Sequence, residues 1–293
     1  MTRVEPRSCW ADVEGLRLHY LDWPGDGPAL LCLHGLTANC RYWDALAERM
    51  TPRYRVIAVD FRGRGQSDQP PAGNYGVAAH VRDMAAFVKA TELGPVTVVG
   101  HSMGAFVAAL LAADYPDLVS RAVLVDGGGM RENQIGESVR AQIQGAIARL
   151  SRVFPSLKAY LDFWRQMPYA NPWNEHWERY LAADLEQRGE GSLVCRASPA
   201  AVEEDLLSSL NMWEYLPRVR VPALVLWAPR GLLAPDQPLM SGDLMEEVAR
   251  LLPQGRLVTV RGANHYTIAL APECLDQMES ALSDLLGTSI NPD

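Results

Sequence analysis

Six short runs of apolar residues recur along the chain and predict β-strands that are buried on both faces. They cover residues 29–33, 56–59, 96–99, 122–125, 224–227 and 257–260. Two alternating stretches, 9–13 and 16–22, come before them, and the Glu14-Gly15 pair between these stretches predicts a hairpin at a sheet edge. The pattern therefore predicts a mostly parallel sheet of eight strands.

Segments with helical periodicity separate these runs. They cover residues 43–50, 77–91, 103–115, 245–252 and 272–286. Strands that alternate with helices predict a doubly wound α/β fold, in which ligands bind at the carboxyl ends of the strands.

A long stretch between the sixth and seventh predicted strands has helical periodicity but no convincing strand. It is too long for an ordinary crossover, so we interpret residues 127–220 as an inserted helical cap on a core made of 1–126 and 221–293. The cap is rich in aromatic residues, most of which we expect to pack its own helices. Trp173 and Trp177 are the candidates for contacting a substrate from above.

The strand predicted at 96–99 leads directly into Gly100-His101-Ser102-Met103-Gly104, and an apolar helical segment follows. Strand, Gly-x-Ser-x-Gly turn and helix in this order expose a nucleophilic serine on a sharp turn. The turn strains the serine backbone, and a β-carbon on either flanking glycine would collide with the neighbouring strand or helix. Ser102 is therefore the candidate nucleophile.

Composition and charge exclude several classes of function. The 293 residues carry a net charge of −8 without a cluster of Lys and Arg, which argues against nucleic-acid binding. The five cysteines are scattered and lack C-x-x-C spacing, so we expect free thiols and no zinc site. The chain shows no apolar run of about 18 residues and no apolar leader, from which we expect no membrane contact and a cytoplasmic location.

Three more motifs follow predicted strands: Leu-His-Gly-Leu at 33–36, Asp-Phe-Arg-Gly-Arg-Gly-Gln-Ser at 60–67, and Gly-Ala-Asn-His at 262–265. Together with the serine turn they resemble the motifs of the α/β-hydrolase superfamily, in the branch with a helical cap between the sixth and seventh core strands. The resemblance covers almost the whole chain. It implies a hydrolase that works without a cofactor or a metal ion.

The resemblance also implies roles for individual residues. His265, in the loop after the last strand, would be the base that activates Ser102. The backbone N–H groups of Leu36 and Met103 would form the oxyanion hole. We interpret the 60–67 motif as a structural turn, because its Gly-x-Gly lacks the complete spacing of a nucleotide-binding loop.

The third member of the triad departs from the commonest pattern of the family, in which an Asp follows the seventh strand. Gly231 occupies that place here. Two carboxylates could replace the missing acid: Asp126, at the end of the sixth strand, and Asp236, five residues beyond the usual place. We favour Asp126, because a strand end holds a carboxylate more rigidly than a loop does.

These residues lead us to expect hydrolysis of a small-molecule carboxylic ester or lactone with an apolar moiety, through an acyl-enzyme. A serine at the nucleophile position excludes the reactions of dehalogenases and epoxide hydrolases, which resemble this pattern but use an Asp there. A carbon–carbon bond hydrolase or a thioesterase would use the same triad. A non-catalytic ligand receptor on the same fold is the alternative from another class.

Overall fold

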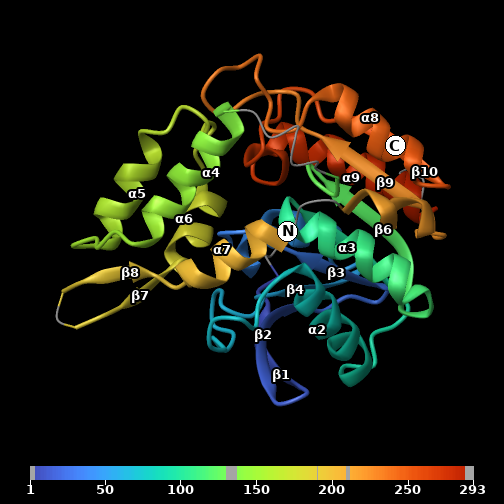
Figure 1. Ribbon diagram of the computed structural model, residues 1–293, viewed down its shortest axis with the longest axis horizontal. Helices are drawn as coiled ribbons and strands as arrows, with labels where there is room; N and C mark the ends of the chain where they lie inside the picture. Colours follow the sequence, from blue (N-terminus) through green and yellow to red (C-terminus); the bar gives the residue numbers. More distant parts are fainter. Residues whose placement is uncertain (1–3, 130–136, 190, 209–211, 288–293) are drawn as a thin grey trace.

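An eight-stranded sheet forms the centre of the computed structural model, which describes residues 4–129, 137–189, 191–208 and 212–287 (Figure 1). In the order of the sheet, the strands are β1 (Arg7–Val13), β2 (Leu16–Trp23), β4 (Arg55–Val59), β3 (Ala29–Leu33), β5 (Val96–His101), β6 (Val119–Val125), β9 (Ala223–Trp227) and β10 (Gly255–Thr259). β2 runs antiparallel to both of its neighbours, and the remaining pairs are parallel. The predicted fold class is confirmed.

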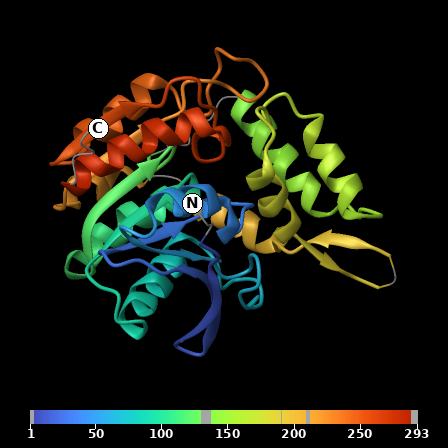
Figure 2. The ribbon, with the colours of Figure 1, turned by 180° about the vertical axis from the view of Figure 1, so that it is seen from behind.

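Helices cover both faces of this sheet. They are α1 (Asp44–Met50), α2 (Val77–Ala90), α3 (Met103–Asp114), α8 (Gly242–Leu251) and α9 (Pro272–Leu286). Side chains alternate along each strand: Leu30 and Cys32 pack on the face of α1 and α9, whereas Leu31 and Leu33 pack on the face of α2, α3 and α8. Figure 1 shows α2 and α3 in front of the sheet, and Figure 2 shows α9 from behind.

Short 3₁₀ helices connect several of these elements. They are η1 (Cys40–Trp43), η2 (Pro116–Leu118), η4 (Met212–Arg218) and η5 (Thr267–Ala269). None of the helices in the described residues is both long enough and apolar enough to span a bilayer.

The segment between β6 and β9 contains α4 (Glu137–Leu150), α5 (Leu157–Arg165), α6 (Glu175–Ala183) and α7 (Pro199–Ser208). Residues 130–136, at its entry, lie outside the described part of the chain. We call the described residues 137–218 the inserted segment. In both views its helices α4–α6 lie to one side of the sheet, and the buried aromatic residues between Phe154 and Tyr180 join the same hydrophobic cluster as α1 and α9.

The expectation that this region holds no strand is corrected. β7 (Leu185–Gln187) and β8 (Leu193–Cys195) pair antiparallel as a small hairpin, and Phe154 adds a bridge to Leu193. Strands of three residues are too short to produce a visible alternation in the sequence, so the pattern gave no signal.

The turn between β5 and α3 has the strained geometry that the sequence predicts. Ser102 has φ 54° and ψ −117°, a region that residues with a β-carbon rarely occupy. A β-carbon on Gly100 would overlap the carbonyl of Gly104, and one on Gly104 would overlap the carbonyl of Leu33 in β3. The two glycines therefore let strand and helix approach closely enough to hold the serine at the end of the sheet.

We expect Gly104→Ala to lower the free energy of unfolding by more than about 2 kcal/mol, because the new methyl group meets backbone that cannot move aside. Gly145→Ala is the matched control: Gly145 lies exposed in α4 with no atom within 4 Å of the new β-carbon, so the change should be neutral or stabilising by up to about 1 kcal/mol. Urea unfolding of both variants measures the difference. Equal stability of the two would contradict the packing described for the turn.

Candidate active site

Ser102 lies at the floor of a cavity at the carboxyl end of the sheet. Its backbone N–H donates to the carbonyl of Val125, 2.9 Å away, which ties the turn to the end of β6. The empty space of the cavity is about 890 Å³, including the solvent at its open mouth. The lining residues are Gly35, Leu36, Thr37, Ala38, Tyr42, His101, Ser102, Met103, Phe106, Ala146, Tyr180, Leu206, Leu232, Leu239, His265 and Tyr266.

His265 lines this cavity together with Ser102, and its ring is held from behind by Asp126. The ring Nδ1 lies 2.6 Å from Asp126 Oδ2, and both side chains are buried. If Nδ1 donates its proton to the carboxylate, the neutral ring presents Nε2 as an acceptor. Among the described contacts no hydrogen bond joins this ring to the Ser102 hydroxyl, and such bonds often tighten only when substrate binds.

Asp126 is fixed by its backbone as well as by its side chain. It directly follows β6, with φ 46°, a left-handed conformation that Asp tolerates better than most residues. Its N–H donates to the carbonyl of Leu226 at 2.8 Å, and its Oδ1 accepts from the N–H of Ala228 at 3.1 Å. The carboxylate is therefore aimed at His265 by the ends of two adjacent strands.

None of the described contacts joins Asp236, the alternative acid, to the imidazole of His265. Asp236 is exposed in the loop after β9, whereas Nδ1 of His265 is already engaged by Asp126. Gly231, which stands where the commonest pattern has its acid, lies in a tight turn where a β-carbon would overlap the carbonyls of Ala234 and Gln237. A carboxylate side chain at that position would not fit this loop.

His101 holds the backbone of His265, a contact that the sequence did not predict. Its Nε2 lies 2.8 Å from the carbonyl of His265, and its ring stacks on Tyr42 at 4.5 Å between centroids. Burial, reinforced by the nearby His265, holds the pKa of His101 well below its usual range. A neutral His101 can donate from Nε2 to that carbonyl without adding positive charge beside His265.

The two residues expected to supply the oxyanion donors both line the cavity. Met103 is the first residue of α3, where a backbone N–H has no acceptor within the helix. Leu36 lies in the loop after β3, and among the described residues its N–H has no protein acceptor either. Gly35 approaches the turn closely enough that a β-carbon there would lie 3.2 Å from Cβ of Ser102.

Trp173 and Trp177 do not lie where the sequence argument expected them. Their rings stack on each other at 5.9 Å between centroids, and Trp177 is fully buried against Trp164 and Tyr266. Neither is among the described residues that line the cavity. They instead form the aromatic interior of the inserted segment, and the residues of that segment that reach the cavity are Ala146, Tyr180 and Leu206.

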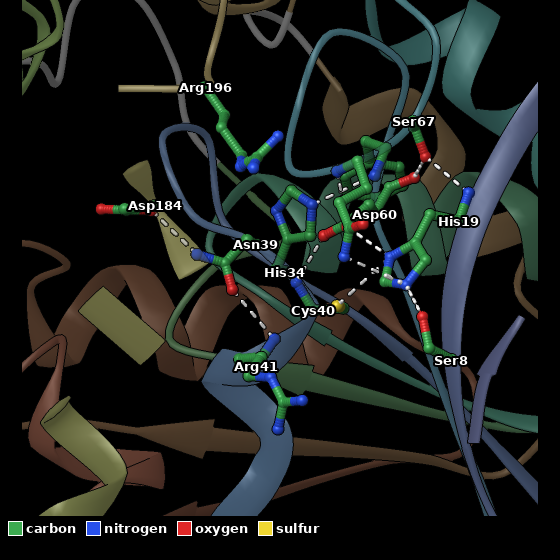
Figure 3. Close-up of polar contacts among 12 residues, drawn as sticks. Ser8, His19, His34, Asn39, Cys40, Arg41, Asp60, Ser67, Asp184 and Arg196 are labelled. Carbon is green, nitrogen blue, oxygen red and sulfur yellow. Dashed lines mark hydrogen bonds and ion pairs between the residues drawn. The ribbon is translucent and has the colours of Figure 1, made fainter. Parts of the chain in front are cut away.

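One buried cluster in the described residues has the composition of a metal site. Possible ligand atoms of His19, Cys40 and Asp60 lie within 4.8 Å of one another (Figure 3). Each group already has a structural role: His19 binds Asp60 at 2.7 Å and Ser8 at 2.9 Å, and Asp60 also accepts from the N–H of Cys40 at 2.7 Å. Burial, with the charge of Asp60, also raises the pKa of the Cys40 thiol, which opposes the thiolate that a metal requires. The arrangement fits a structural hydrogen-bond cluster that ties the loop after β3 to β2.

The profile of the α/β hydrolase fold family matches residues 28–272, and the chain belongs to this family. It is 30% identical over 250 residues to 2-(acetamidomethylene)succinate hydrolase of Mesorhizobium japonicum, with 85% of each chain covered. It is also 30% identical over 284 residues to N-formylmaleamate deformylase of Pseudomonas putida, with 93% of each covered. A crystal structure of E-2-(acetamidomethylene)succinate hydrolase superposes with a TM-score of 0.82 at 26% identity, over 96% of this chain and 99% of that one.

His34, in the loop beside the site, makes the free energy of unfolding depend on pH. Its Nδ1 donates to the carbonyl of Gly35 at 2.8 Å, and its Nε2 accepts from the N–H of Phe61 at 3.1 Å, so the ring must be neutral. Burial lowers the pKa of His34 to about 4 from its usual 6.5. Since the unfolded chain takes up this proton at higher pH than the folded one, the stabilisation is complete above pH 6.5 and is lost as the pH falls towards 4.

We expect this contribution to the free energy of unfolding to be on the order of 3 kcal/mol. Urea unfolding of the wild type and of His34→Gln at pH 7.5 and pH 4.5 isolates it, because the other titrating groups are common to both proteins. The variant should lose less stability than the wild type between the two pH values. Parallel losses would show that His34 is not held neutral.

Proposed function

We propose that this protein is a serine hydrolase that cleaves a carboxylic ester or lactone with an apolar moiety through an acyl-enzyme. The observation that carries the proposal is the 2.6 Å contact between Asp126 and His265, on the wall of a largely apolar cavity that Ser102 also lines. These three groups supply an orienting acid, a base and a nucleophile, which are the requirements of acyl transfer.

In the first half of the proposed reaction, Nε2 of His265 takes the hydroxyl proton of Ser102 while the oxygen attacks the acyl carbon. Asp126 stabilises the imidazolium that forms and keeps the ring in the tautomer that presents Nε2. The imidazolium then returns the proton to the leaving alcohol. Water, activated by the same ring, hydrolyses the acyl-enzyme in the second half.

The negative charge on the substrate oxygen needs donors that are in place before the reaction begins. In the proposed mechanism these are the backbone N–H groups of Leu36 and Met103, each worth on the order of 3 kcal/mol in the transition state. Both belong to residues that line the cavity. Their role depends on backbone position, so the side chains contribute to substrate contact separately.

The walls of the cavity support an apolar acyl or alcohol group. No Lys or Arg is among the described residues that line it. The apolar lining residues are Leu36, Met103, Phe106, Leu206, Leu232 and Leu239. The nearby buried Arg149 is already paired with Asp184 at 3.0 Å. A carboxylate on the substrate would lose its hydration here without gaining a cation. In this proposal residues 127–220 act as a cap, which contributes Ala146, Tyr180 and Leu206 to the cavity.

A second candidate, hydrolysis of a bond other than an ester, is suggested by the names of the relatives and not by the lining of the cavity. Their names refer to hydrolysis of a substituted succinate and to removal of a formyl group, not to esterases. Removal of an N-formyl group breaks an amide bond. Cleavage of an amide, like that of a carbon–carbon bond or a thioester, would use the same nucleophile, base and acid as ester hydrolysis. The two candidates differ in the substrate that the walls accept, and the apolar lining favours the ester or lactone.

Covalent labelling tests the proposed function most simply. A fluorophosphonate should label the wild type at Ser102 and leave Ser102→Ala unlabelled, because only an activated serine attacks phosphorus rapidly. A panel of p-nitrophenyl esters of graded chain length, beside several lactones and N-formylmaleamate, should show highest kcat/KM for an apolar acyl chain. Absence of labelling would favour a non-catalytic ligand receptor, and preference for N-formylmaleamate would contradict the substrate class.

The assignment of the acid has its own test. Asp126→Asn should lower kcat by about four orders of magnitude, because the amide favours the wrong tautomer of His265. Asp236→Asn is the matched control, since it makes the same chemical change on an exposed carboxylate, and we expect kcat within about twofold of wild type. Steady-state kinetics on one ester measure both, and near-normal turnover by Asp126→Asn would refute the assignment.

A further inference from the structure

The loop that carries Leu36 is held by side chains from outside the catalytic groups. Arg64, in the turn after β4, donates from Nε to the carbonyl of Leu36 at 3.1 Å. Its Nη2 lies 2.6 Å from Oδ2 of Asp205, in α7 of the inserted segment, and both side chains are fully buried. A chain of contacts therefore runs from the inserted segment through one guanidinium to the peptide beside a proposed oxyanion donor.

Both peptide groups around Leu36 are fixed by hydrogen bonds. The carbonyl of Gly35 accepts from Nδ1 of His34 at 2.8 Å and from the N–H of Ala38 at 3.2 Å. The carbonyl of Gly35 and the N–H of Leu36 belong to one trans peptide and point in opposite directions. The N–H of Leu36 therefore points away from the two groups that donate to this carbonyl. Arg64 fixes the carbonyl of Leu36, which belongs to the following peptide group. The two peptide planes together set the direction of the Leu36 N–H.

Asp205 is itself held rigidly, so it can serve as an anchor. Its Oδ2 lies 2.9 Å from Nε2 of His80, and its Oδ1 accepts from the N–H of Gly76 at 2.6 Å, on either side of the start of α2. Both views place α7 between the helices α4–α6 and the sheet (Figures 1 and 2). Seating of α7 on the core and placement of Arg64 are therefore coupled.

The far end of the same loop has a second attachment to the inserted segment. The side-chain amide of Asn39 donates to Asp184 at 2.8 Å and to the carbonyl of Tyr180 at 3.1 Å, while Cys40 is tied to Asp60 of the core (Figure 3). The loop from Gly35 to Cys40 is thus held between core and inserted segment at both ends.

We infer that Arg64 and Asp205 are positioning residues, through which the inserted segment sets the Leu36 N–H for stabilising the oxyanion. The inference rests on the proposed function, because it concerns the transition state of that reaction. The pair touches no reacting atom. Its effect should appear in kcat and in binding of tetrahedral adducts, because misplacing an oxyanion donor changes transition-state binding more than substrate binding.

The chain provides a matched control in the same turn. Arg62 forms an analogous Arg–Asp pair with Asp83, with Nε 2.6 Å from Oδ2, but its partner lies in α2 of the core and its side chain does not contact Leu36. Arg62→Met and Arg64→Met each remove one such pair from the turn. A general loss of stability should therefore follow from both, and an effect on the oxyanion only from the second.

The experiment compares Arg64→Met, Arg64→Lys, Asp205→Asn and Arg62→Met with the wild type, using p-nitrophenyl butyrate turnover, n-butylboronic acid inhibition and thermal unfolding. Arg64→Lys keeps a charge for Asp205 but has no N–H at the Nε position, so it should fold and still lose the contact with Leu36. We expect kcat to fall by about tenfold to a hundredfold in both Arg64 variants, with KM within about twofold. The boronic acid forms a tetrahedral adduct with an active serine, and the affinity of the Arg64 variants for it should fall by a similar factor.

Asp205→Asn should also lower kcat. Arg62→Met should leave kcat and boronic acid affinity within about twofold of wild type. If the wild type hydrolyses the ester and the Arg64 variants keep its kcat and boronic acid affinity, the positioning role is refuted and the proposed function stands. Equal losses in Arg62→Met and Arg64→Met also refute it, since they would reflect stability alone. A wild type that neither hydrolyses esters nor reacts with a fluorophosphonate overturns the proposed function, and the inference with it.

Discussion

The hydrogen bond between Asp126 and His265 is the contact on which the rest of the site depends. Its 2.6 Å length is set by the ends of two adjacent strands, because Asp126 follows β6 and is tied to Leu226 and Ala228 in and after β9. The next residue, Gly127, passes so close to Ser102 that a β-carbon there would overlap the serine carbonyl. Asp126 and the turn that carries Ser102 are thus parts of one packed unit at the carboxyl end of the sheet.

The inserted segment completes this unit in two ways. It contributes Ala146, Tyr180 and Leu206 to the cavity. It also contacts the loop after β3, directly from Asp184 to Asn39 and indirectly from Asp205 through Arg64. Its aromatic interior is continuous with the core on the face of α1 and α9. Substrate selection and placement of the oxyanion loop are therefore connected in our account, because the same segment takes part in both.

Much of this could be predicted from sequence because the determining patterns are local. Continuous apolar runs mark the parallel strands, and strand, glycine-flanked serine and helix follow one another within residues 96–115. Asp126 could be placed near His265 because the carboxyl ends of parallel strands lie at the same end of the sheet. The β7–β8 hairpin, the burial of Trp177 and the Arg64–Asp205 pair gave no such signal. Each depends on which distant side chains meet, and neither periodicity nor composition specifies that.

The central claim is that Ser102 becomes covalently acylated during turnover. Rapid quenching of the wild type with p-nitrophenyl butyrate, followed by digestion and mass spectrometry, measures this directly. We predict an added butyryl group on the peptide that contains Ser102, appearing and decaying at rates that account for kcat. Turnover at the full rate with no adduct at Ser102 would contradict the account.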